Sequence, residues 1–251
     1  MFGVLHAVLL RPLPIRDQTH AVVLWSEAKN QPGAHVPLRN GFLWEVSRHS
    51  RAFSGVGSVA LGGATAFMAR DQDRTFPVAV SFVDGGFFSV LGTVPRYGRM
   101  LAPNDDEAGA PRVVVISDRL WRQQFGGDPK VIGRSIDLQG ATQLIVGITP
   151  PGFAYPADAD AWSSYPQMER RFSSAPNEDG GWFDLVARLK PSVSLEQART
   201  KVQALLRQFS SKTLPEPSDR VAELRPIADL IIGDERPALL ILTTAGCSFS
   251  S

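Results

Sequence analysis

The stretch WFDLVARLKPSVSLEQARTKVQALLRQF, residues 182–209, holds the strongest structural signals in this chain of 251 residues. Apolar and polar residues alternate from Trp182 to Leu189, which predicts a β-strand. Ser194 and Gln197 fit a capping box, in which the hydroxyl and the amide each satisfy a backbone N–H at a helix start. The apolar stripe that follows predicts a helix of about four turns packed on a sheet; its members are Leu195, Ala198, Val202, Leu205, Leu206 and Phe209.

The neighbouring segments extend this pattern to an α+β fold. Residues 221–227 read as a returning strand, and strand, helix, strand is the α+β or split βαβ pattern. Gly92 and Gly126 stand where two short helices should end, and Ser117 or Asp118 can cap the second of these helices. Pro77 places its strand at a sheet edge or a strand end. The further expected elements are strands at 21–25, 75–82 and 112–116, helices at 38–50 and 84–91, and a hairpin at 135–148.

The composition excludes some classes of protein. A formal charge of +1, from 26 Lys+Arg and 25 Asp+Glu, gives no uniform basic field for nonspecific nucleic-acid binding. With 43% hydrophobic residues the chain has enough apolar material to fill a core, so disorder is not expected. Cys247 is the single cysteine, which rules out an intrachain disulfide and fits a cytosolic or a periplasmic address equally.

The motifs that would carry cofactor chemistry are weak. Residues 55–60, GVGSVA, match the loose dinucleotide fingerprint, but a helix and a loop precede them rather than a strand, which favours a tight turn of small residues. No phosphate-binding loop of the GxxxxGK[ST] type is present. His6, His20, His35 and His49 lack an HExxH spacing, so scattered surface or core imidazoles are expected rather than a zinc site.

Candidate catalytic groups are equally isolated. The acidic run at residues 104–107, NDDE, lacks the alternating spacing and glycine of a calcium loop, so a solvated turn is expected. Ser117 has no histidine near it in sequence and offers no activated nucleophile. Paired carboxylates for glycosidic chemistry cannot be recognised from spacing alone. The residues by themselves therefore point to no catalytic, cofactor-binding or metal-binding site, and glycosidic chemistry stays unsupported rather than excluded.

The two ends of the chain are apolar. Residues 1–10 read MFGVLHAVLL and residues 237–251 read PALLILTTAGCSFSS. Each run is shorter than the roughly 20 residues of a spanning helix, and the first lacks the charged start and cleavage site of a signal peptide. Two interpretations stay open from hydropathy: halves of membrane helices, or an ordinary core strand at 4–10 and core helix at 239–242.

Five phrases occur in an order that resembles a known family. They are VLLRPLP at 8–14, VSFVDGGFFSVLGTVPRYGRML at 80–101, VVVISDRLWRQQFGGDPKVIGRSIDLQG at 113–140, VGITPPGF at 146–153 and VARLKPSVSLEQAR at 186–199. The chain resembles the MacB-like periplasmic core domain of bacterial FtsX-like, MacB-type ABC transporter permeases. The phrases cover most of the chain, so this resemblance is more specific than any single motif.

The resemblance implies a domain organisation. Residues 1–13 would be the end of a transmembrane helix, and 236–251 the truncated start of the next, so the chain would be a fragment of a permease. Residues 14–93 and 181–235 would form a discontinuous porter-like lobe, with a mostly β lobe inserted at 94–180. Both ends should leave the folded body at the same membrane surface.

The resemblance also implies a function. The domain would sit in the periplasm, anchored in the inner membrane, and would couple ATP-driven change on another chain to substrate export or a periplasmic partner. The family offers no catalytic residue to carry over, so the resemblance implies a domain that is not an enzyme and needs no cofactor and no nucleic acid. Its partners would be a separate ATP-binding subunit, the membrane through the flanking helices, and a second permease half or homodimer. The competing hypothesis is a soluble periplasmic ligand-binding module with a cleft between two lobes. A hydrolase is the weakest candidate.

Overall fold

The structure of this chain is a computed structural model. It describes residues 13–36, 38–60, 63–138, 140–164, 182–213 and 220–230. The membrane-helix segments expected at 1–13 and 236–251 lie outside these ranges, apart from Leu13. Within the described ranges, no helix is both long and apolar enough to cross a bilayer.

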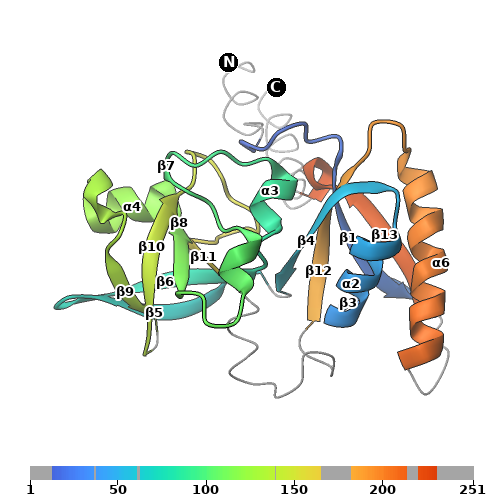
Figure 1. Cartoon of the computed structure of the whole chain (residues 1–251), viewed down its shortest axis with the longest axis horizontal. Coiled ribbons are helices and arrows are strands. Elements are labelled where there is room, and N and C mark those ends of the chain that lie inside the picture. Colours follow the sequence, from blue (N-terminus) through green and yellow to red (C-terminus); the bar gives the residue numbers. More distant parts are fainter. Residues whose placement is uncertain are drawn as a thin grey trace, which may run out of the picture.

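The described elements are mostly strands, with several helices, which confirms the α+β class (Figure 1). In chain order they are β1 (Ala21–Ala28), β2 (Gln31–Val36), β3 (Leu38–Arg39), α2 (Asn40–His49), β4 (Phe53–Ala60), β5 (Thr65–Asp71), β6 (Arg74–Val83), α3 (Phe87–Leu91), β7 (Tyr97–Gly98), η1 (Pro103–Asp106), β8 (Val113–Ile116), α4 (Asp118–Phe125), η2 (Pro129–Val131), β9 (Ser135–Leu138), β10 (Ala141–Ile148), β11 (Ala161–Ser164), β12 (Trp182–Leu189), α6 (Leu195–Thr213) and β13 (Arg220–Pro226).

One part of the molecule is an antiparallel sheet with helices on one face, which we call the helix-covered sheet. Its strands lie in the order β4-β12-β1-β13, and α2 and α6 pack on one side (Figure 1). Alternate residues of each strand point to this side, as the strand period requires. They bury a core with the two helices that includes Val22, Leu24, Phe42, Val46, Leu185, Ala187, Ala198, Val202, Leu206 and Leu224.

The other part is a ring of strands, which we call the barrel. The strands pair in the order β11-β8-β10-β9-β5-β6, and a parallel pairing of β11 with β6 closes the ring. The barrel core also includes side chains of α4, and its members include Phe76, Val78, Val80, Val114, Ile116, Leu120, Trp121, Phe125, Ile136, Ile145 and Ile148. Closure removes the unpaired edges that an open sheet would expose.

A third apolar cluster joins the two parts. The face of the helix-covered sheet opposite its helices contributes Ala21, Val23, Trp25 and Val186, and the outer side of the barrel contributes Val113, Val115 and Trp162. Helix α3 lies between them, where Phe88 packs within 5.8 Å, ring centre to ring centre, of both Phe153 and Trp162. Aromatic side chains therefore fill the contact between the two parts.

Most elements expected from the sequence are confirmed. The capping box of α6 forms as expected: Ser194 N–H donates to Gln197 Oε1 at 3.0 Å, and Gln197 N–H donates to Ser194 Oγ at 3.2 Å. Ser117 caps α4 by accepting the Leu120 N–H at 3.0 Å. Gly92 ends α3, and Gly126 ends α4, each with a positive φ. The strand β8 is buried at every residue, and β9 and β10 form the expected hairpin.

The expectation of a tight turn at residues 55–60 is wrong, because these residues belong to β4. This strand pairs with β12 along most of its length and meets β6 at Val59 and Val83. Instead of forming a turn, Gly57 allows the backbone at the start of α3 to approach β4 closely. A Cβ on Gly57 would lie 2.7 Å from the backbone nitrogen of Phe87. The sequence pattern of small residues therefore marks a place where α3 touches the sheet.

The barrel begins earlier in the chain than the insertion expected at 94–180. Strands β5 and β6 precede residue 94, yet Phe76, Val78 and Val80 pack inside the barrel with Val114 and Ile116. The position of Pro77 agrees with its expected edge location: it faces Met68 of β5, and the pairing of β6 with β11 starts only at Val80.

Candidate functional site

The segment that follows residue 12 is held against the rest of the protein by apolar side chains. Leu13 and Ile15 are buried in the cluster between the two parts, together with Ile227. Leu230 packs against the same cluster. The first and last described residues of the chain therefore contact one core, and Figure 1 shows both segments at the same end of the molecule.

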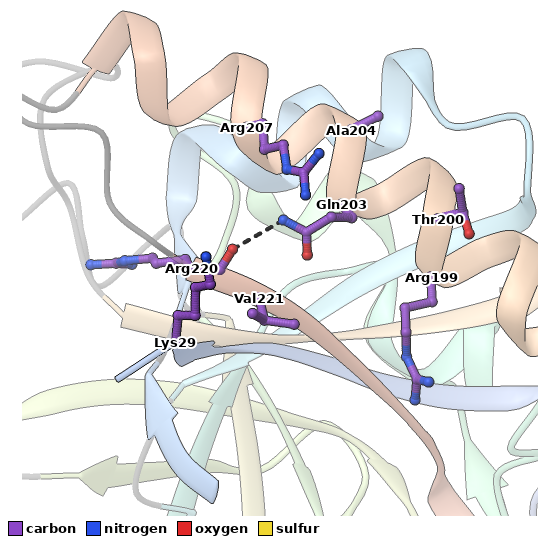
Figure 2. A pocket seen from close by; sticks show the side chains of 8 residues that line it. All are labelled: Lys29, Arg199, Thr200, Gln203, Ala204, Arg207, Arg220 and Val221. Carbon is purple, nitrogen blue, oxygen red and sulfur yellow. Dashed lines mark hydrogen bonds between the residues drawn. The ribbon is translucent and has the colours of Figure 1, made fainter. Parts of the chain in front are cut away.

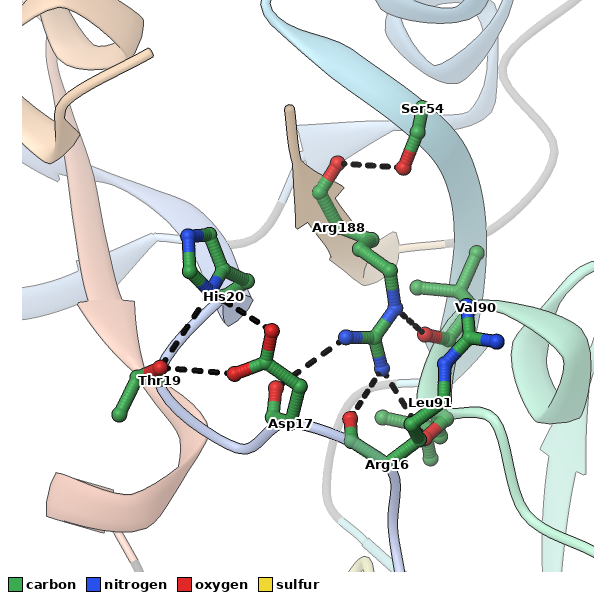
Figure 3. A network of polar contacts seen from close by, with 8 residues as sticks. All are labelled: Arg16, Asp17, Thr19, His20, Ser54, Val90, Leu91 and Arg188. Atoms are coloured by element: carbon green, nitrogen blue, oxygen red, sulfur yellow. Dashed lines mark hydrogen bonds and ion pairs between the residues drawn. The ribbon is translucent and has the colours of Figure 1, made fainter. Parts of the chain in front are cut away.

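Arg188 of β12 ties this first segment to α3. Its side chain is 8% exposed, on the sheet face opposite the helices. The guanidinium donates to the carbonyl oxygens of Arg16 (2.6 Å), Asp17 (3.1 Å), Val90 (2.7 Å) and Leu91 (3.1 Å), as Figure 3 shows. The planar fork of an arginine spreads five N–H donors over three nitrogens, so it can reach acceptors on separate segments, whereas the three donors of a lysine share one nitrogen. One buried side chain thus joins three segments of the chain.

The electrostatics of Arg188 follow from its acceptors. Burial lowers the pKa of the guanidinium from its ordinary value, and the nearby charge of Arg16 acts in the same direction. The carbonyls of Val90 and Leu91 lie at the C-terminal end of α3, where the backbone dipoles favour a positive charge. The Arg16 N–H also donates to the Leu91 carbonyl at 3.0 Å. The helix end is therefore satisfied by the first segment and by Arg188 together.

Asp17 shapes the turn that carries these carbonyls. Its φ of 45° lies in the left-handed region, which aspartate tolerates better than most residues. Its carboxylate accepts a hydrogen bond from Thr19 Oγ1 at 2.8 Å and pairs with His20 at 2.8 Å. The hydrogen bond from His20 is the main reason that the pKa of Asp17 is lowered. These contacts hold the exposed turn in the conformation that presents its carbonyls to Arg188.

A second polar junction lies at the start of α3. Asp84 is buried, and its carboxylate accepts hydrogen bonds from Ser58 Oγ and from the Gly86 N–H, each at 2.9 Å. Asp106 accepts the Gly85 N–H at 2.7 Å and Ser164 Oγ at 2.6 Å. These bonds connect β4, the start of α3, η1 and β11.

The solvated turn expected at residues 104–107 is therefore wrong for two of its carboxylates. Asp105 is 4% exposed, and both of its oxygens accept from the Arg99 guanidinium, at 2.6 and 2.7 Å. Asp106 holds the start of α3, as described above. The acidic run links separate parts of the fold, because its hydrogen-bond partners Arg99, Gly85 and Ser164 come from other segments of the chain.

Burial raises the pKa of Asp84 to about 6, and the charge of Asp106 acts in the same direction. The folded protein therefore takes up a proton between about pH 4 and pH 6 where the unfolded chain does not, so stability falls as pH rises through this window. The Asp84→Asn variant has no carboxyl group to titrate at this position. Between pH 4 and pH 7 we therefore expect its free energy of unfolding to rise by about 2–3 kcal/mol relative to that of the parent protein. Urea unfolding across this range measures the difference.

The exposed carboxylate Asp73 provides the matched control for this measurement. The change Asp73→Asn removes a carboxylate from an exposed position, so it measures how the loss of one surface charge alone affects stability across the same pH range. If the curves of Asp84→Asn and the parent protein run parallel from pH 4 to pH 7, the protonation of Asp84 is not linked to folding.

The residues considered from sequence do not gather into one reactive site. His35 pairs with Asp184 at 2.7 Å and stacks on Trp25, His49 pairs with Glu45, and His20 belongs to the turn above. His6 lies outside the described residues. Among the described residues, no group of three or more metal-ligating side chains is present. The junction residues Arg188 and Asp84 were missed by the sequence analysis.

Taken together, the fold and the two junctions define a class of protein. A barrel and a helix-covered sheet share one apolar contact, and polar junctions fasten the first segment of the chain to that contact. This is a two-part α+β arrangement, and comparison with known proteins assigns its class.

Known structures and a family model agree with this class. The model for the MacB-like periplasmic core domain matches residues 5–205. The periplasmic region of MacB from Actinobacillus actinomycetemcomitans superposes with a TM-score of 0.65 at 12% identity, over 91% of this chain and 98% of that one. The chain belongs to the MacB-like periplasmic core domain family, the periplasmic domains of MacB-type ABC transporter permeases, which confirms the resemblance found in the sequence.

Two further solved structures share the fold. The extracellular domain of the noncanonic ABC-type transporter YknZ from Gram-positive bacteria gives a TM-score of 0.60 at 12% identity, over 81% of this chain and 99% of that one. A domain of a putative permease protein from Porphyromonas gingivalis gives 0.61 at 15% identity, over 85% and 93%. No curated protein sequence matches this chain.

Proposed function

We propose that this chain is a non-catalytic coupling domain of an inner-membrane ABC transporter permease. It passes a conformational change, driven by ATP on a separate subunit, to substrate export or to a periplasmic partner. Arg188 is the observation that carries the proposal, because it fastens the segment after residue 12 to both β12 and α3. A displacement of a membrane helix before Leu13 would then move the sheet and α3 together.

The proposal includes a division into two lobes. The helix-covered sheet is the porter-like lobe, formed by residues 13–60 and 182–230, and the barrel at 65–164 is the inserted lobe. This division moves the insertion boundary ahead of β5, because β5 and β6 share the barrel core. Leu13 and Leu230 contact one cluster, which supports two flanking helices that enter the same membrane face. A second permease half or a second copy would complete the transporter.

The test uses the complete permease that carries this domain, together with its ATP-binding subunit. Spin labels are placed at two exposed positions, Met68 on β5 and Lys201 on α6, in a background with Cys247 replaced by serine. We expect the distance between the labels to change when ATP and vanadate trap the ATP-binding subunit. The change Arg188→Met should abolish most of this shift.

Two results would contradict the proposal. Identical distance distributions with and without trapped nucleotide would mean that the domain does not respond to ATP. A full shift in the Arg188→Met variant would mean that the coupling does not pass through this junction. Arg119→Met is the matched control, since the Arg119 side chain is 56% exposed and makes one ion pair, with the less exposed Asp160, away from this junction.

A further inference from the structure

A groove of about 550 Å³ runs between α6 and β13 on the outer side of the helix-covered sheet (Figure 2). The strand β13 is the last in the order of the sheet, and among the described strands it pairs with β1 alone. One long edge of β13 therefore faces the groove. Its lining residues are Lys29, Arg199, Thr200, Gln203, Ala204, Arg207, Arg220 and Val221.

Side chains of α6 form hydrogen bonds with the backbone groups along this edge of β13. The Gln203 amide donates to the Arg220 carbonyl at 3.0 Å, and its oxygen accepts the Ala222 N–H at 2.7 Å. Arg199 donates to the Leu224 carbonyl at 3.2 Å. Residues 220, 222 and 224 alternate along β13, which is the spacing at which a neighbouring strand would form its hydrogen bonds. Gln203 and Arg199 thus make the hydrogen bonds that a neighbouring strand would otherwise make with β13.

The groove is positively charged. Its eight lining residues include four cations and no carboxylate. Arg199 is paired with Glu196 at 2.7 Å and with Glu223 at 3.5 Å. The side chains of Lys29 and Arg207 make no hydrogen bond or ion pair within the part of the chain that the structure describes. Val221 is 41% exposed and adds an apolar surface beside these charges.

We infer that this groove binds an extended acidic segment of a partner protein, which adds to the sheet as a strand along β13. The backbone of the segment would replace Gln203 at the Arg220 carbonyl and the Ala222 N–H. Its carboxylates would pair with Lys29 and Arg207. This goes beyond the proposed coupling function, because a partner segment can bind at β13 whether or not the junction at Arg188 transmits movement.

The geometry favours a peptide over other anions. A phosphate or a lipid headgroup could pair with Lys29 and Arg207, but it would leave the row of backbone donors and acceptors on β13 unused. An extended peptide uses both features: main-chain hydrogen bonds provide affinity, and alternate side chains provide specificity. A strand can displace the Gln203 amide from β13, because the displaced amide can form hydrogen bonds with water instead.

The test measures binding of a labelled peptide of about six residues, the usual length of a strand, with alternating Glu and Val and with blocked ends. Fluorescence anisotropy with the intact chain should show saturable binding that weakens as salt is raised. Arg207→Glu and Lys29→Glu should each weaken binding about tenfold or more, which corresponds to about 1.4 kcal/mol. Gln203→Ala should strengthen binding, because no side chain then competes for β13.

The controls separate this site from general charge effects. Arg70→Glu, an exposed cation on the barrel strand β5, should leave the affinity unchanged. The same peptide with alternate backbone nitrogens methylated should not bind, because it cannot pair with an edge strand. The inference is overturned if no peptide binds, if the methylated peptide binds equally well, or if Arg70→Glu weakens binding as much as Arg207→Glu. Binding to anionic lipid vesicles without binding of the peptide would overturn it as well.

Discussion

Replacing Gly57 with alanine is expected to destabilise this domain by about 3 kcal/mol. An added Cβ would lie 2.7 Å from the Phe87 nitrogen and 2.8 Å from the Gly86 carbonyl carbon and the Phe87 Cα. These atoms are backbone, so no side-chain rotation can relieve the contact. Either β4 or the start of α3 must move, and both carry the apolar contact between the barrel and the helix-covered sheet.

Gly55, two residues earlier on the same strand, provides the matched control. A Cβ there would meet only the Val90 Cγ2, at 3.2 Å, and a methyl group at the end of a side chain can yield by a few tenths of an ångström. We expect Gly55→Ala to cost about 1 kcal/mol or less. Urea unfolding of the two variants and the parent protein measures both values. Equal losses would show that the approach of α3 to Gly57 is not what limits this position.

The sequence predicted those elements whose signals are local. The capping box of α6 and the glycine that ends α3 depend on residues within one or two helical turns, and both are confirmed. The role of residues 55–60 could not be predicted in this way. Position 57 has no room for a side chain because the backbone of Phe87, which follows 30 residues later, lies against it. Likewise Asp106 is held by Gly85 and Ser164, which are distant in the chain.

Arg188 shows why the candidate site was missed. In the strand WFDLVARL, one alternation places Phe183, Leu185 and Ala187 on an apolar face. The other face mixes the charged Asp184 and Arg188 with Val186, a pattern typical of a partly exposed surface. The barrel and α3 cover part of that second face, and this contact is not visible in the strand itself. The structural role of Arg188 depends on backbone carbonyls that only the folded chain brings within reach of its guanidinium.

The change Arg188→Met is expected to lower the free energy of unfolding by about 3 kcal/mol. Methionine keeps the apolar stem of the side chain but leaves the carbonyls of Arg16, Asp17 and Val90 without this donor. The Leu91 carbonyl keeps its bond from the Arg16 N–H. Arg188→Lys should show an intermediate loss, because a single ammonium cannot reach acceptors on both segments in the geometry of the guanidinium fork.

The loss should also be local, and hydrogen exchange can detect this. In Arg188→Met the amides of residues 13–20 and of α3 should lose more protection than the fall in global stability explains. Those of the barrel strands β8 and β10 should lose only the protection that corresponds to the lower free energy of unfolding. Arg119→Met removes a guanidinium that is 56% exposed, so it should cost less than about 1 kcal/mol and should not expose either region beyond that small change. Uniformly faster exchange in Arg188→Met would mean that Arg188 supports the whole fold, and that the first segment of the chain is not specifically fastened by it.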